Sequence, residues 1–113
     1  MVDLSYVTDM AGGNNEIVFE MIDVFIGQVP EFIEEMNSCF EKKDWYNLGM
    51  IAHKAKSSVA ILGMEEQANN LKKLELLAKE EKEKESYARM IHEFEKDCLV
   101  AIEELNQHKL RNT

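Results

Sequence analysis

The sequence has 113 residues, of which 45% are hydrophobic, and it carries a formal net charge of −9. The length suits a single domain over residues 1–113, and the apolar content is sufficient for a folded core. The negative charge argues against a nucleic-acid binder, which needs a clustered Lys/Arg face, and against an anionic membrane surface as partner.

The N-terminal stretch MVDLSYVTDM is acidic and has no long apolar run. It therefore predicts no signal peptide, and no apolar run in the chain is long enough for a bilayer span, so we expect a soluble, cytoplasmic protein. Residues 4–10 predict a short helix that Gly12 and Gly13 end. Asn14 or Asn15 is expected to cap the next helix, because an Asn side chain accepts a hydrogen bond from a free backbone amide.

The next segment carries the most regular amphipathic pattern and ends at Lys42 and Lys43. Its apolar residues recur at steps of three and four and form one face: Val18, Met21, Ile22, Phe25, Val29, Phe32, Ile33, Met36 and Phe40. Pro30 lies inside this segment. We expect a kink or a break there, because proline lacks an amide donor and its ring clashes with the preceding turn.

Three further helices are predicted after this segment. Asp44 is expected to cap a helix that runs to about Leu62, with Gly63 as its stop signal. A fourth helix places Met64, Ala68, Leu71, Leu74 and Ala78 on one face. The charged residues 79–85 (KEEKEKE) predict a solvated helix end and a connection. Ser86 can then cap a last helix, whose apolar stripe runs from Tyr87 to Leu105.

These segments predict an all-α fold, an antiparallel up-down-up-down four-helix bundle with a short extra N-terminal helix. The connections between the helices are short, and short connections force neighbouring helices to run antiparallel. Cys39 and Cys98 both lie on apolar helical faces and are expected to be buried free thiols.

The third predicted helix separates an apolar stripe from one histidine. When each residue advances about 100° around the axis, the apolar residues gather within roughly 60° of Leu48: Leu48, Ile51, Ala52, Ala55, Val59 and Leu62. His53 falls at about 140° from Leu48 and therefore points away from the core.

Small residues surround His53 on this outer face. Gly49 and Ser57 lie one turn away, Ala60 lies two turns away, and Lys56 lies at the edge between this face and the core. An exposed helix face normally carries long side chains, and glycine costs about 1 kcal/mol there relative to alanine. Such a face lets another surface approach the ring closely, although a face packed against a second subunit would show the same pattern.

These residue types suit phosphoryl transfer. A neutral imidazole, with a reference pKa of about 6.5, is a competent nucleophile near neutral pH and can attack a phosphoryl group held on a partner. The Lys56 ammonium can lie near the phosphoryl oxygens, while the partner supplies the acyl phosphate and a metal ion. A surface His followed by a Lys is nonetheless common in helices that have no such role.

Residues 52–58 (AHKAKSS) and 62–64 (LGM) together resemble the signature of histidine phosphotransfer (HPt) domains of two-component phosphorelays. The family pattern has an Ala-His pair, a Lys three residues after the His, small residues next, and a Gly ten residues after the His. Residues 74–75 (LE), Phe25 and Asp44 also match it. The chain departs from the pattern at Ala55, where the family usually has Leu, and at Ser57, where it usually has Gly.

The resemblance implies that His53 is the phosphorylated residue and that Lys56 stabilises the phosphoryl charge. The implied partners are response-regulator receiver domains, including those of a hybrid sensor histidine kinase, and the expected partner contacts are Gly49, Met50, Ser57 and Ala60. The family has no activity of its own toward ATP. We therefore expect no cofactor in this chain and Mg²⁺ on the partner receiver domain. We also expect a monomer, which an unbroken polar exterior favours.

The same residues argue against other classes of function. None of the three histidines has a Glu three residues before it, and there is no HExxH motif or Cys/His cluster, so no metal site is expected. His92 and His108 are interpreted as ordinary surface residues. An ATP-dependent kinase would need a glycine-rich phosphate loop, and the only glycine pair is Gly12-Gly13. The alternative that stays open is a non-catalytic docking or oligomerisation module that binds receiver domains without carrying phosphate.

Overall fold

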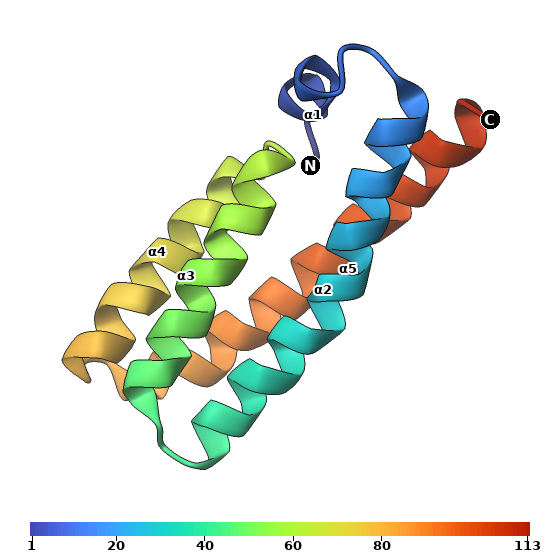
Figure 1. Ribbon diagram of the computed structural model, residues 1–113. Helices are drawn as coiled ribbons and strands as arrows, with labels where there is room; N and C mark the ends of the chain where they lie inside the picture. Colours follow the sequence, from blue (N-terminus) through green and yellow to red (C-terminus); the bar gives the residue numbers. More distant parts are fainter.

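Helices account for most of the chain, and no strand is present in the computed structural model, which describes residues 1–113. The elements in chain order are α1 (Ser5–Met10), α2 (Asn15–Glu41), α3 (Trp45–Ile61), α4 (Glu65–Glu80), the short 3₁₀ helix η1 (Lys84–Ser86) and α5 (Tyr87–Arg111). Helices α2 to α5 form an elongated bundle in which each helix runs opposite to the one before it (Figure 1). The predicted helical bundle is confirmed.

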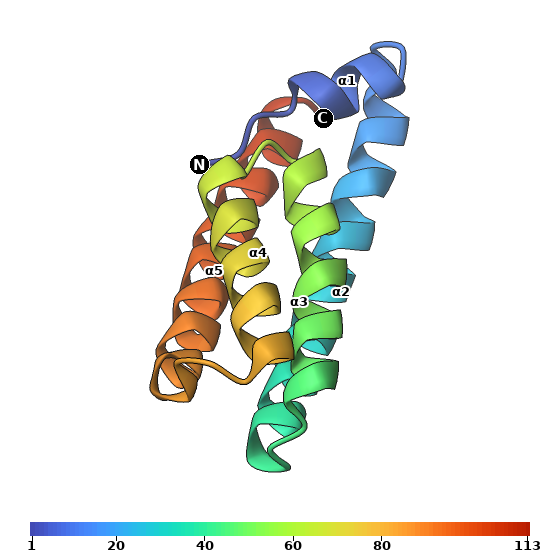
Figure 2. The same cartoon turned by 90° about the vertical axis from the view of Figure 1, so that its left-hand side faces the viewer.

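The short helix α1 lies across the end of the bundle where α3 meets α4 and where α5 ends (Figure 2). The residues before α1 are joined to the α3–α4 turn by a hydrogen bond from the Asp3 amide to the Leu62 carbonyl at 2.8 Å. Gly63 follows with φ +72°, and a Cβ on it would lie 2.5 Å from the Asp3 Cβ. Glycine is therefore required here both as the end of α3 and for the close approach of the N-terminal segment.

The helix starts follow the predicted capping residues at two positions. The Asn14 side chain accepts hydrogen bonds from the amides of Glu16 and Ile17, and the Asp44 side chain accepts one from the amide of Asn47. Ser86 occupies the N-cap position of α5, but its side chain makes no capping hydrogen bond. That predicted cap is wrong, because Ser86 is already in a helical conformation as the last residue of η1 and its amide donates to the Glu83 carbonyl.

The predicted break at Pro30 does not occur, since α2 continues through it from Asn15 to Glu41. Pro30 is exposed, so its ring faces away from the core. The missing amide removes a single hydrogen bond on the solvent side of a 27-residue helix. Packing of the long apolar face of α2 holds the helix together across this point.

One cluster of buried apolar side chains fills the interior of the bundle. The stripe predicted for α3 supplies Leu48, Ala52, Ala55 and Val59, which are fully buried. Cys98 is a buried free thiol, as predicted, whereas Cys39 is only half-buried because it lines a hollow between α2 and α3. None of the helices combines the length and the apolar character that a bilayer span requires.

Candidate functional site

His53 lies on the outer face of α3 with its side chain 52% exposed. The core stripe of α3 fixes this orientation, because Ala52 and Ala55 on either side of it are fully buried. Ser57 and Ala60, one and two turns further along, are exposed and small. The ring is therefore open to solvent and is approached across a shallow surface.

The opposite edge of the ring contacts a carboxylate on α4. Glu75 follows the buried Leu74 and precedes the buried Ala78 by three residues, so the packing of α4 places Glu75 at the α3–α4 junction with its side chain only 11% exposed. The His53 Nδ1 atom lies 3.1 Å from Glu75 Oε1. A nearly buried carboxylate thus meets the inner side of an exposed imidazole.

Two lysines share the same carboxylate. The Lys56 Nζ atom lies 3.4 Å from Glu75 Oε1, and the Lys79 Nζ atom lies 2.8 Å from Glu75 Oε2. Lys56 is thereby on the same side of α3 as His53, and the two side chains meet at a single oxygen atom. The site is a cluster of four side chains with Glu75 at its centre.

The ionisation of Glu75 follows from these contacts. Burial alone would raise its pKa, but the hydrogen bonds from Lys79, His53 and Lys56 outweigh burial and lower the pKa of Glu75 to about 2. The carboxylate is therefore ionised at neutral pH and can only accept hydrogen bonds. It follows that the proton of a neutral His53 ring is on Nδ1 and that the free electron pair is on Nε2.

Gly49 does not lie on the open face next to His53, and that expectation is wrong. It is buried under α4, where a Cβ would lie 2.9 Å from Lys79 Cγ and 3.1 Å from the Glu75 carbonyl oxygen. The absence of a side chain at Gly49 leaves room for the Lys79 stem to lie against α3, while its ammonium contacts Glu75 one turn away on α4. Met50, another expected partner contact, is half-buried, whereas Ser57 and Ala60 are exposed.

The roles of Glu75 and Lys79 were missed at the level of sequence, although a signal was present. Glu75 lies four residues after Leu71 and directly after Leu74, so it is a charged residue on the apolar stripe of α4. A carboxylate in that position is rarely buried without a partner. Lys79 is four residues further on, which is the spacing of an ion pair on one helix face.

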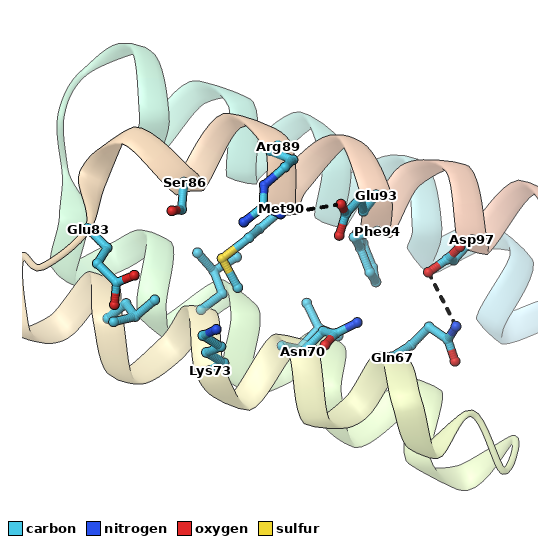
Figure 3. A pocket seen from close by; sticks show the side chains of 13 residues that line it. Gln67, Asn70, Lys73, Glu83, Ser86, Arg89, Met90, Glu93, Phe94 and Asp97 are labelled. Atoms are coloured by element: carbon cyan, nitrogen blue, oxygen red, sulfur yellow. Dashed lines mark hydrogen bonds and ion pairs between the residues drawn. The ribbon is translucent and has the colours of Figure 1, made fainter.

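One cavity of the protein lies away from this site. It has a volume of about 150 Å³ and lies between α4 and α5, where Asn70, Lys73, Arg89 and Met90 are among the side chains around it (Figure 3). None of the four side chains of the His53 cluster lines it. The His53 site is thus an exposed surface rather than a pocket, which suits a macromolecular partner better than a small ligand.

The other two histidines lie apart from this cluster. His92 is exposed, and His108 is half-buried with its ring edge-on to Phe19 at a centroid distance of 6.4 Å. The structure contains no group of three or more His, Cys, Asp or Glu side chains arranged to hold a metal ion.

A protein-family model described as the Hpt domain matches residues 20–108 of the chain. The match covers all of α3 and α4 and most of α2 and α5, and leaves α1 outside. No curated protein matches the chain, and no solved structure matches it.

Proposed function

Since the chain belongs to the Hpt domain family of two-component systems, we propose that it is a phosphocarrier whose acceptor is His53. The phosphoryl group comes from the aspartyl phosphate of a response-regulator receiver domain and passes from His53 to the aspartate of another receiver. The observation that carries this proposal is the hydrogen bond from His53 Nδ1 to the ionised Glu75 at 3.1 Å, which leaves the nucleophilic Nε2 on the exposed side of the ring.

The transfer step needs no base on this chain. The electron pair of Nε2 forms a bond to phosphorus, while the bond from phosphorus to the aspartyl oxygen breaks and its electrons stay on the departing carboxylate. The proton on Nδ1 stays in place, so the product ring carries a positive charge. Glu75 lies beside that charge and stabilises it through a charge-assisted hydrogen bond.

Lys56 is the cation that neutralises the phosphoryl charge in this proposal. Its ammonium already lies 3.4 Å from the carboxylate oxygen that His53 contacts, and its side chain is 25% exposed. A lysine stem is flexible enough to swing the ammonium from Glu75 toward the phosphoryl oxygens. Lys79 remains on the other oxygen of Glu75 and keeps the carboxylate in place.

The partner supplies the rest of the chemistry. Phosphoryl transfer requires charge neutralisation by a metal ion, and we propose that the Mg²⁺ is held by the receiver domain, including that of a hybrid sensor kinase. The four side chains of the His53 cluster come from α3 and α4, and we propose that the carrier is a monomer. We also propose that it works in the cytoplasm, where free thiols such as Cys98 persist.

The test is incubation of the full chain with phosphorylated receiver domains and Mg²⁺, followed by exposure of the labelled product to acid and to base. We expect a label that is lost in acid and kept in base, as for phosphohistidine. The His53→Gln variant should acquire no label, while His92→Gln and His108→Gln should be labelled like the wild type. A label that survives acid, or that persists in His53→Gln, contradicts the proposal.

A further inference from the structure

The cavity between α4 and α5 is lined by apolar and charged side chains of both helices. Its volume is about 150 Å³, which is enough for a benzene-sized molecule. Met90 and Phe94 of α5 face Asn70 of α4 across this space (Figure 3). The apolar part of the wall is made of Leu71, Leu74, Leu77, Met90 and Phe94. The cavity therefore offers apolar contacts to a small ligand between its charged ends.

One end of the cavity is closed by a hydrogen bond between the two helices. The Gln67 Nε2 atom donates to Asp97 Oδ2 at 3.2 Å, and the Gln67 side chain is buried at the start of α4 (Figure 3). Glu93 lies one turn before Asp97 on the same face of α5. The lysine and the arginine of the lining lie toward the other end. Two carboxylates therefore give the Gln67 end a negative charge.

The opposite end of the cavity carries two cations. Lys73 of α4 and Arg89 of α5 lie there, and Glu83 is the acid of this end. Lys73 makes no ion pair, and the contact of Arg89 with Glu93 is long, at 3.9 Å between two exposed side chains. An exposed pair of this kind contributes little to stability, so Arg89 is free to contact a ligand. With two cations against one acid, the Glu83 end has a net positive charge.

The distance between the two charged ends suits a short linear molecule. Arg89 and Asp97 are eight residues apart on α5, which is about 12 Å along the helix axis. Lys73 and Gln67 are six residues apart on α4, which is about 9 Å. The long, flexible side chains of Lys73 and Arg89 shorten this span when they lean over the cavity. A chain of a few methylene groups therefore reaches from one end to the other.

We propose that this cavity binds a small linear zwitterion, an amino carboxylate with an apolar chain between its two charged groups. Its carboxylate lies against Lys73 and Arg89. Its ammonium lies against Glu93 and Asp97, and its chain covers the apolar wall. A ligand with a single charge leaves one of the two ends unmatched. None of these residues belongs to the His53 cluster, so the assignment goes beyond the proposed phosphocarrier function and does not depend on it.

The first experiment titrates ε-aminocaproate into the full chain labelled with nitrogen-15 and follows the backbone amide signals. The matched control ligands are caproate, which lacks the ammonium, and hexylamine, which lacks the carboxylate. We expect ε-aminocaproate to shift the signals of the residues around the cavity with a Kd of about 1 mM, the scale for a ligand of about nine non-hydrogen atoms. Caproate and hexylamine should each bind about fivefold more weakly, because each lacks one charge-assisted contact.

The second experiment repeats the titrations with one variant from each end of the cavity. Lys73→Gln should weaken the binding of ε-aminocaproate and of caproate about three- to tenfold and leave that of hexylamine unchanged. Asp97→Asn should weaken ε-aminocaproate and hexylamine by a similar factor and leave caproate unchanged. Lys72→Gln and Glu95→Gln are the matched controls, because both residues lie outside the cavity on the same two helices, and they should bind like the wild type.

Several outcomes would overturn the zwitterion site. One is a titration in which ε-aminocaproate shifts no signal around the cavity, or shifts only signals on α3 near His53. Another is an equal Kd for the three ligands in the wild type, because the two charged ends would then play no part in binding. A variant that loses affinity for caproate and hexylamine alike would contradict the assignment of the two ends, since only a general change in the cavity produces that result.

Discussion

Replacing Glu75 by Gln is the sharpest perturbation of the site, because it keeps the size of the side chain and removes the charge. In the wild type the carboxylate accepts hydrogen bonds from His53 Nδ1 and from two lysines. A Gln side chain can still accept one hydrogen bond through its oxygen, but it has no charge to stabilise the phosphorylated ring. The prediction is slower phosphorylation of His53 with little change in the fold.

The size of the effect follows from the contact between His53 and Glu75. Hydrogen bonds to charged groups contribute about 1.5–3 kcal/mol and neutral ones about 0.5–1.5 kcal/mol, so the exchange costs about 1.4 kcal/mol, or tenfold in rate. The ammonium groups of Lys56 and Lys79, released from Glu75, attract the phosphoryl group and offset part of this loss. We expect a net decrease of about three- to tenfold.

Two measurements check this prediction. The first is the rate of label transfer from a phosphorylated receiver domain to the wild type, to Glu75→Gln and to the control Glu66→Gln, an exposed and unpaired residue on the same helix. The second is the ring tautomer of His53, observed by long-range proton–nitrogen NMR. The wild type should have the proton of the neutral ring on Nδ1, and Glu75→Gln should gain a population with the proton on Nε2.

Wild-type transfer rates in Glu75→Gln, together with an unchanged tautomer, would refute this reasoning. A loss of rate without any change in tautomer would show that Glu75 acts only by holding α3 against α4. Thermal unfolding of the same variants distinguishes that structural role. If Glu75 only holds α3 against α4, Glu75→Gln should lower the melting temperature as well as the rate of transfer.

Three further perturbations test the cluster from other directions. Lys56→Ala should slow phosphorylation about tenfold, the scale of a lost charge-assisted contact, and Lys56→Arg should restore part of the rate in the same transfer assay. Gly49→Ala should lower the free energy of unfolding by about 1 kcal/mol, because overpacking against Lys79 and the Glu75 carbonyl outweighs the gain in helix propensity. The control Gly27→Ala has open space around the new side chain and should raise the free energy of unfolding by up to about 1 kcal/mol. Chemical denaturation measures both. The pKa of Glu75 is about 2 in the folded protein against an ordinary 4.5. Its contribution to stability should therefore be complete above about pH 4.5 and disappear as the pH falls toward 2, and this acid-dependent loss should be smaller in Glu75→Gln.

The sequence predicted the helices well because their boundaries depend on local signals. Asn14 and Asp44 cap the helices that follow them, and Gly63 ends α3 with a positive φ. Each of these signals acts over three or four residues, so it can be recognised without knowledge of the fold. Of the kink or break expected at Pro30, the break does not occur, because continuation of the helix there depends on tertiary packing, which a local pattern does not contain.

The site was predicted only in part, because half of it comes from another helix. The orientation of His53 follows from the periodicity of α3 alone. The contact with Glu75 depends on how far α4 is shifted along α3, and that shift is set by core packing and by the close approach at Gly49. For the same reason Gly49 was expected on the open face: the pattern shows which residues are small but not which of them the neighbouring helix covers.

The most direct test of the account is NMR of the phosphorylated full chain, with phosphorus-31 and nitrogen-15 observed together. We predict one phosphoryl group bonded to Nε2 of His53, with the ring proton on Nδ1 facing Glu75. A phosphoryl group on Nδ1 of His53, or on His92 or His108, would contradict it.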